Sequence, residues 1–321
     1  METNSKTVNF RLILSILVFI GMLGAVKPVL FNGGSSTAKY FAKKNQLQMV
    51  SEEKAEDYFE AVVFGEGQAE LTEFESEVEE NRTHSVESVY QIDKWIAGLL
   101  LFGTALLLIP KVLNSPAYHL LLINSIWLIC LSIALSLNGG KRFSELALAA
   151  HATRWGLPLL LWWVIFNYRK GKDLTKDSNP AVYLLLICCS LTFAVHGWEA
   201  FCLNPPFQDL IYGFGNFLGI SISTDLNSAI LKTVGCMDLI LAGIIFFVRS
   251  PKIFMWMAFW GIITATSRPL TLGIEAWPEL AMRIANCGLP LMLYLLYRKP
   301  VEKLIENQTE EIPMEVQCEQ T

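Results

Sequence analysis

Six ionisable side chains lie within or beside stretches of sequence that are otherwise apolar, and their chemistry most needs an explanation. They are His196, Glu199, Asp238, Arg268, Glu279 and Arg283. An ionised group inside a membrane is costly, so such groups are rare there and usually pair or line a polar path. The i, i+3 spacing of His196 and Glu199, and the i, i+4 spacing of Glu279 and Arg283, place each pair on one helix face. We therefore expect these six residues to form a ligand-binding site, and we assign no catalytic role.

Asp238 lies near the middle of its apolar stretch. A carboxylate at that depth takes up a proton or pairs with a cation. We therefore predict that Asp238 lies within ion-pair or hydrogen-bond reach of Arg268, Arg283 or His196. One interpretation is a polar pocket that opens to the outer face and binds a small polar or quinone-like ligand. The other is a buried ion-pair network that only holds helices together.

Other chemistry has little support in the sequence. The chain has no phosphate-binding glycine loop, no Gly-x-Ser-x-Gly, no His-Glu-x-x-His and no Cys-x-x-Cys. No metal site is therefore expected. Cys202, Cys236 and Cys287 come near the outer ends of apolar stretches, where a disulfide and free thiols are alternatives.

The elements that position these residues are membrane-spanning helices. The 321 residues are 53% hydrophobic and only 17% charged, against roughly 25% charged in soluble domains. Runs of about 20 apolar residues recur, long enough to cross a hydrocarbon core of ~30 Å as helices. We predict an all-α polytopic membrane protein with spans at 12–31, 95–113, 117–137, 146–168, 181–201, 229–248, 253–273 and 280–298. The net charge of −5 and the lack of a basic stripe exclude a nucleic-acid partner, so the lipid bilayer is the expected environment.

Lysine and arginine residues gather at one set of span ends, notably in 168–172 (Tyr-Arg-Lys-Gly-Lys) and 297–299 (Tyr-Arg-Lys). Positive charge near span ends marks the cytoplasmic side. We therefore expect both termini in the cytoplasm and the protein in the plasma (inner) membrane. The span 12–31 lacks a clean cleavage site and is interpreted as a retained anchor.

The segment 51–93 lies on the expected outer side and carries fourteen acidic residues against Lys54 and Arg82 alone. One interpretation is a solvated loop with an amphipathic helix near 58–63. The other is a docking surface for a cationic protein partner or divalent ions.

An internal repeat organises the chain. Ser-Glu-Leu-Ala at 144–147 and Gly-Leu-Pro at 156–158 match Pro-Glu-Leu-Ala at 278–281 and Gly-Leu-Pro at 288–290, and each copy runs on to Tyr-Arg-Lys. The predicted domains are a first four-helix unit (1–170, with an acidic outer insertion at 32–94), a linker (171–180), a second four-helix unit (181–299) and an acidic tail (300–321). Because each unit has an even number of spans, we expect two parallel-repeat bundles that superpose by rotation about the membrane normal.

The second unit resembles the DoxX-like family of four-helix bacterial membrane proteins. The matching residues are His-Gly-Trp-Glu-Ala at 196–200 and the glycine-bounded helix around Asp238 from 235 to 244. The family places a lysine where this unit has Glu199, while Lys27 lies at the matching place of the first unit. The resemblance implies a small membrane subunit linked to quinone or sulfur redox chemistry, with quinone as the implied cofactor. The alternatives are a carrier for a small metabolite, which broken helices at the Gly-Leu-Pro motifs would favour, and a non-catalytic scaffold with an acidic docking segment.

Overall fold

Every regular element in the computed structural model is a helix over the residues that it describes, namely 2–31, 35–44, 68–139, 142–170 and 180–298. Side chains are described for residues 11–31, 35–44, 86–139, 142–170 and 180–298. The long helices are α1 (Glu2–Phe31), α3 (Gln68–Leu106), α5 (Leu120–Asn138), α7 (Ala152–Arg169), α8 (Pro180–Phe201), α10 (Thr224–Ile244), α11 (Pro251–Leu272) and α12 (Trp277–Tyr297). The shorter ones are α4 (Pro110–Leu113), η1 (Pro116–His119), η2 (Ser144–Leu146), α6 (Ala147–Ala150), α9 (Pro205–Phe217) and η3 (Ile274–Ala276). The predicted all-α fold class is confirmed.

Five segments are long and apolar enough to cross a membrane by length and composition. They are Arg11–Lys44, Pro116–Asn138, Pro180–Phe201, Thr224–Ile244 and Ile274–Tyr297. Each overlaps one predicted span. Helices also occupy the other three predicted positions, as α3, α7 and α11, but they carry more polar or aromatic residues. The structure therefore supports a membrane protein, in which lipid would surround the apolar helices.

Three elements differ from their expected form. The predicted span 95–113 is divided between α3, which ends at Leu106, and α4, which begins at Pro110. The predicted solvated loop at 51–93 is wrong for its second half, because α3 begins at Gln68 and is 39 residues long; the expected helix at 58–63 lies outside the described residues. The predicted span 146–168 is interrupted at His151, whose backbone (φ −99°, ψ 14°) separates α6 from α7. By contrast, α7 and α12 continue through Pro158 and Pro290, so the Gly-Leu-Pro motifs do not break these helices.

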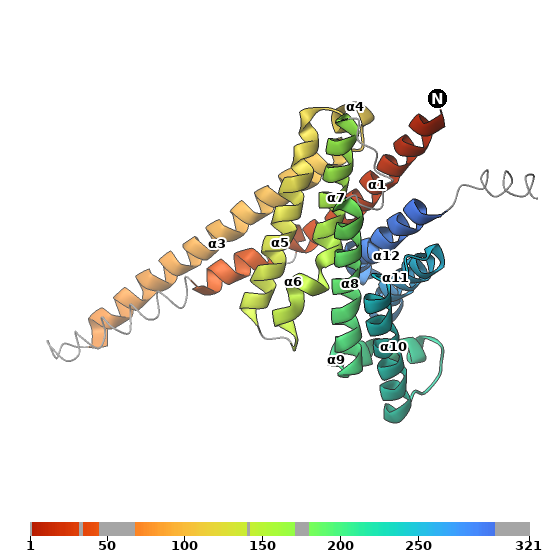
Figure 1. The fold of residues 1–321 in the computed structure, drawn as a ribbon. Coiled ribbons are helices and arrows are strands. Elements are labelled where there is room, and N and C mark those ends of the chain that lie inside the picture. The colour runs from red at the N-terminus through yellow and green to blue at the C-terminus, as the bar shows by residue number, and fades with distance from the viewer. Residues whose placement is uncertain (1, 32–34, 45–67, 140–141, 171–179, 299–321) are drawn as a thin grey trace, which may run out of the picture.

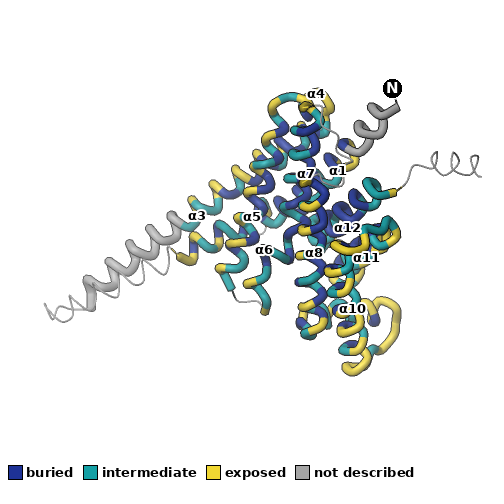
Figure 2. Tube along the Cα trace, viewed as in Figure 1, coloured by how far each residue is buried: buried dark blue, intermediate teal, exposed yellow. Residues whose placement is uncertain are grey.

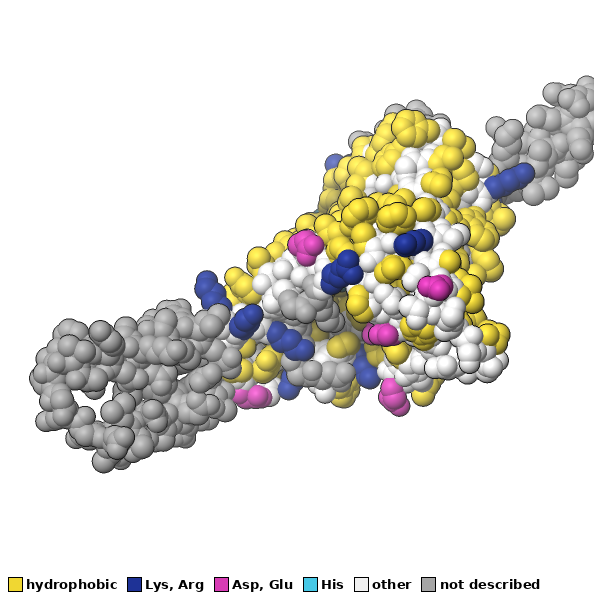
Figure 3. Space-filling view, turned by 90° about the horizontal axis from the view of Figure 1, so that it is seen from below, with side chains coloured by type: hydrophobic (Ala, Val, Ile, Leu, Met, Phe, Trp, Pro, Cys, Tyr) yellow, Lys and Arg dark blue, Asp and Glu magenta, His cyan; other side chains and the backbone are white. Residues whose placement is uncertain are grey.

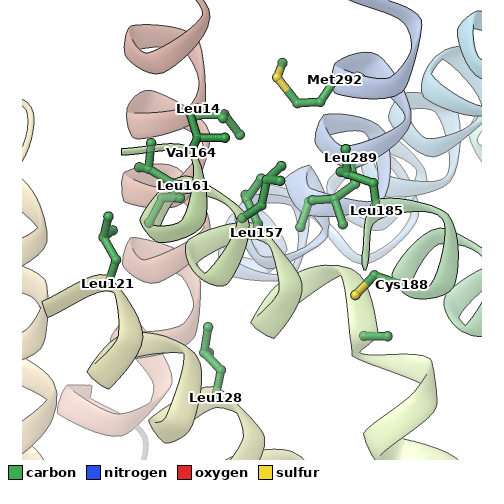
Figure 4. Close-up of a cluster of buried hydrophobic side chains, with 14 of the residues drawn as sticks. Leu14, Leu121, Leu128, Leu157, Leu161, Val164, Leu185, Cys188, Leu289 and Met292 are labelled. Atoms are coloured by element: carbon green, nitrogen blue, oxygen red, sulfur yellow. The ribbon is translucent and has the colours of Figure 1, made fainter. Parts of the chain in front are cut away.

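The core lies where α1, α5, α7, α8 and α12 meet (Figure 1). Leucines from these helices interdigitate, among them Leu14, Leu121, Leu161, Leu185 and Leu289, all at most 1% exposed (Figure 4). Figure 2 shows the same pattern, with buried residues in the middle of α7 and α12 and exposed residues along α10 and α11. The burial pattern makes α7 and α12 the centre of the molecule.

The principal helix contacts correspond in the two halves, apart from the contact of α3 with α5, which α10 and α11 do not reproduce to the same extent. In the first half α1 packs on α3 and α7, and α5 packs on α7; in the second half α8 packs on α10 and α12, and α11 packs on α12. Between the halves, α1 packs on α12, α8 packs on α7, and α7 packs on α12. The first helix of each half therefore docks on the last helix of the other half.

Glycines allow these cross-half contacts. A Cβ at Gly156 of α7 would lie 2.6 Å from Sγ of Cys188 on α8, and one at Gly288 of α12 would lie 3.1 Å from Cδ1 of Leu17 on α1. Small residues let helices approach closely in a membrane. The two Gly-Leu-Pro motifs therefore each lie at a crossing between the halves.

The outer faces of the helices are apolar. Exposed side chains include Leu99, Phe102, Ile126, Ile240 and Phe259, each more than half exposed. Figure 3 shows one face on which hydrophobic side chains surround isolated basic and acidic ones. An exposed surface of this kind fits contact with lipid.

Candidate functional site

The six predicted site residues fall into three separate groups in the structure. Glu279 joins two arginines: its Oε2 lies 3.1 Å from Nη1 of Arg283, one turn along α12, and 3.8 Å from Nε of Arg268 on α11. Arg268 is only 8% exposed, while the Glu279 side chain is 41% exposed. This group ties the ends of α11 and α12 together at the surface.

His196 and Glu199 form the second group. Nδ1 of His196 lies 3.0 Å from Oε2 of Glu199, as their shared helix face predicts. The imidazole ring also packs edge-on against Phe207 of α9, with ring centroids 6.0 Å apart. Phe207 also lies under the guanidinium of Arg268, with Cζ 5.8 Å from the ring centroid. α9 therefore connects the second group to the first through an aromatic ring.

Asp238 stands apart from both groups. It is 6% exposed, its Oδ1 is buried without a hydrogen-bond partner, and the side chain that hydrogen-bonds its carboxyl is Trp260 of α11. The predicted contact with Arg268, Arg283 or His196 is not formed. Arg283 lies on α12, whereas α10 packs on α8 and α9, and the imidazole of His196 on α8 instead contacts Glu199 of its own helix. The backbone of α8 passes over Asp238, since a Cβ at Gly197 would lie 3.0 Å from its Cβ.

A buried hydrogen bond between α7 and α12 joins the two halves. Oγ1 of Thr153, at the start of α7, donates to Oδ1 of Asn286 on α12 over 2.6 Å, and Oγ1 of Thr192 on α8 accepts from the backbone N–H of Thr153. All three residues are buried. Asn286 continues the face of Glu279 and Arg283 along α12, so the polar groups of the second half reach the first half here.

The cavity of interest lies on the other side of this bond, in the first half. It has a volume of about 340 Å³ and is lined by α1, α5, α7, α12 and residues 35–39. Its walls are mainly apolar, with Met22, Leu128 and Leu157 among them. None of the six predicted residues lines it. The expectation of a site within the second bundle therefore differs from the cavity that the structure contains.

Six residues that line this cavity have polar side chains. They are Ser35, Ser36, Lys39, Ser132, His151 and Arg154. Nδ1 of His151 lies 3.3 Å from Oγ of Ser132, which in turn bonds the carbonyl of Leu128. Lys39 is exposed, so we place the opening of the cavity at its side chain.

Two hydrogen bonds hold the segment at this opening. Oδ2 of Asp93 on α3 accepts from the backbone N–H of Ser35 over 2.7 Å, and Nδ2 of Asn138 on α5 donates to the carbonyl of Ser36. Asp93 belongs to the acidic segment predicted as a docking surface, yet it is buried and serves this structural role. The opening is therefore anchored to two long helices.

Arg154 is the residue that distinguishes the cavity. Its Nε is buried without a hydrogen-bond partner, and its guanidinium forms no ion pair among the described residues. The charged groups that act on it electrostatically are Arg268 and Arg283, which repel it, and Glu199 and Glu279, which attract it. Three guanidinium groups thus share two carboxylates. The Arg154 side chain is half-buried, and no described carboxylate lies within ion-pair distance of it.

Sequence reasoning missed His151 and Arg154. They were counted as part of the span 146–168, close to its outer end, where a charged residue usually reaches the interface. The predicted repeat offered a signal: aligning Gly156 with Gly288 places Arg154 at Asn286 and His151 at Arg283. A charged residue of the first copy that aligns with the predicted site of the second copy is itself a candidate site residue.

No metal centre or disulfide accompanies these groups. Within the described residues no cluster of three or more His, Cys, Asp or Glu side chains could hold a metal ion. Cys202, Cys236 and Cys287 are free thiols in the structure. Of the two alternatives for these cysteines, the structure has the unpaired one.

Comparison of the chain with protein-family models, with curated proteins and with solved structures gives no match. The resemblance to DoxX-like proteins therefore stays a prediction, and the functional argument rests on the site alone.

Proposed function

We propose that this chain is an eight-span integral membrane protein that binds a small amphiphilic organic anion in the cavity beside Arg154. The single observation that carries the proposal is the unpaired guanidinium in a cavity with apolar walls. A half-buried cation without an ion pair gains most from a ligand that brings a carboxylate, because hydrogen bonds to charged groups are the stronger ones. The apolar walls then contact the hydrocarbon part of the ligand.

The eight-span arrangement is supported by the helix contacts. All eight predicted positions hold helices, and the principal helix pairs correspond in the two halves. A rotation that exchanges the halves would exchange α1 with α8 and α7 with α12, which preserves the cross-half contacts. Eight spans would also return both termini to one side, the cytoplasm of a plasma (inner) membrane by the lysine and arginine distribution.

A DoxX-like membrane subunit that holds a quinone is the second candidate, and the contact of His151 with Ser132 favours it. Because Oγ of Ser132 donates to the carbonyl of Leu128, Nδ1 of His151 donates to this Oγ, and the protonated imidazole would carry a second N–H, on Nε2, for a quinone carbonyl in the apolar cavity. The same cavity would serve both ligands, and only the anion uses the charge of Arg154. The six residues of the second half would then be a structural network beside the site rather than its lining.

Binding is tested with purified full-length protein in detergent and three probes that carry an alkyl chain on different head groups: octanoate, octan-1-ol and decylubiquinone. We expect octanoate to bind and octan-1-ol to bind at least tenfold more weakly. Arg154→Gln should weaken octanoate binding by about 10- to 100-fold, since hydrogen bonds to charged groups contribute about 1.5–3 kcal/mol. Isothermal titration calorimetry measures all three ligands.

The control is Arg142→Gln, which removes an exposed arginine that does not line the cavity. Its octanoate affinity should equal that of the wild type. Equal affinity of octanoate and octan-1-ol, or an unchanged affinity in Arg154→Gln, contradicts the anion proposal. Tight binding of decylubiquinone alone supports the quinone candidate instead. Uptake of labelled octanoate by proteoliposomes would extend binding to the carrier alternative.

A further inference from the structure

A second hollow lies at the opposite end of α7, away from the Arg154 cavity. It has a volume of about 290 Å³ and is lined by η1, the end of α7 and the first residue after it: Pro116, Tyr118, His119, Phe166, Arg169 and Lys170. Arg11, near the start of α1, stacks on neighbouring Tyr168 with Cζ 4.0 Å from the ring centroid. The hollow is therefore at the end of the molecule where α1 begins.

Aromatic rings hold the two cations of this hollow. Cζ of Arg169 lies 5.3 Å from the ring centroid of Tyr118, and Nζ of Lys170 lies 4.0 Å from that of Phe166. Both cations are exposed, and neither forms an ion pair with another described residue. Their charge is thus positioned by cation–π contacts, without a carboxylate to neutralise it.

His119 adds a directed donor. Its Nδ1 accepts a hydrogen bond from Nε1 of Trp162 over 3.1 Å. A neutral imidazole whose Nδ1 accepts carries its proton on Nε2, so Nε2–H is left to donate. The imidazole and two cations therefore line one hollow, a combination suited to a phosphate group.

The surface that leads away from the hollow is apolar. Four residues beyond His119, α5 presents Ile123, and Ile126, Ile133 and Leu137 continue at helical spacing, all between 42% and 59% exposed. A free phosphate would gain nothing from this stripe, whereas an acyl chain would lie along it. The stripe decides between the two sources of a phosphate group.

We infer that this hollow binds the head group of an anionic phospholipid, with the acyl chains along the exposed stripe of α5. Basic pockets at the ends of spanning helices recognise such head groups by their charge. The site is specific to the first half: the repeat counterpart of Tyr118-His119 is Ile253-Phe254, which supplies neither a hydroxyl nor an imidazole. The inference is independent of the anion proposed for the Arg154 cavity, which lies at the other end of α7.

The repeat supplies a matched control. Arg298 follows Tyr297 at the end of α12 as Arg169 follows Tyr168 at the end of α7, and both arginines are exposed. Arg169→Gln and Arg298→Gln therefore remove the same charge from equivalent positions, but only the first alters the hollow. The double variant Arg169→Gln/Lys170→Gln removes both of its cations.

Native mass spectrometry of the full-length protein, titrated with phosphatidylglycerol or phosphatidylcholine of identical chains, measures the preference. We expect the wild type to retain phosphatidylglycerol over phosphatidylcholine, and the preference to fall about fivefold in Arg169→Gln and about 30-fold in the double variant. Arg298→Gln should keep it. Equal retention of the two lipids by the wild type, or equal losses in Arg169→Gln and Arg298→Gln, overturns the inference.

A second arm distinguishes the lipid from a free ion. Inorganic phosphate at millimolar concentration should displace little phosphatidylglycerol, because it cannot contact the α5 stripe. Full displacement by phosphate would overturn the lipid assignment and leave an oxyanion site. Circular dichroism confirms that the exposed substitutions leave the helical fold intact.

Discussion

Replacing Arg154 by methionine is expected to stabilise the protein while it removes carboxylate binding. The methionine keeps much of the apolar length of the side chain, and it eliminates the buried Nε that has no hydrogen-bond partner. Such an unsatisfied group costs about 1–3 kcal/mol. The repulsion from two other arginines disappears as well, against the lost attraction of two glutamates. We therefore expect a net gain of about 1–2 kcal/mol in the free energy of unfolding.

Tryptophan fluorescence during heating in detergent, at one scan rate for all variants, follows the change. At about 2–4 °C per kcal/mol for larger domains, Tm should rise by about 2–8 °C. Arg142→Met, at an exposed position, should change stability by less than about 0.5 kcal/mol. The sign of the change in the free energy of unfolding distinguishes an unpaired Arg154 from an Arg154 that is paired with the glutamates. If the arginine is a structural counter-ion of the glutamates, its removal will instead destabilise the protein by about 3–5 kcal/mol, as for a broken buried pair. That result would refute the reasoning.

Three further outcomes follow from the packing and the topology. Glu279→Gln leaves two arginines without their shared carboxylate, and because Glu279 is partly exposed we expect a loss of about 1–2 kcal/mol, read as a fall in Tm; an unchanged Tm would show that the network contributes nothing. Gly235→Ala places a Cβ 2.6 Å from backbone atoms of α8 and should cost about 1–3 kcal/mol, whereas Gly243→Ala meets no atom within 4 Å and should be neutral or stabilising; similar losses in both would contradict the close-approach argument. Single cysteines at Lys252 and Glu275, in a variant without native cysteines, should react from opposite sides of oriented vesicles, and reaction from one side would mean that α11 does not cross.

The sequence predicts the helical elements because their signal is local. Apolar runs of about 20 residues can form only helices in lipid, and every predicted span overlaps a helix in the structure. The pairs His196–Glu199 and Glu279–Arg283 were also predictable, since both lie within one helix and depend only on its periodicity. Contacts fixed by a single helix can be read from residue spacing.

The position of the cavity could not be predicted because it depends on how the two halves meet. Met282 and Ala285 of α12 line a cavity whose other walls belong to the first half. The expectation of two self-contained bundles placed the site within the second one. Asp238 shows the same limit: its depth in the membrane was clear, but its neighbours depend on α10 lying against α8 rather than α12.

The contact of α1 with α12 sets the order in which the protein can be completed during synthesis. Among the described helices α1 is synthesised before α12 and all those between them, yet a Cβ at Gly24 of α1 would lie 2.5 Å from the backbone of Met282. The surface of α1 around Gly24 therefore stays without its contact to α12 until the remaining helices have been inserted. A chain that stops before α12 leaves α1 with its contacts on α3 and α7 but without its contact on α12, so the loss of the carboxy-terminal helix exposes a face of the amino-terminal one.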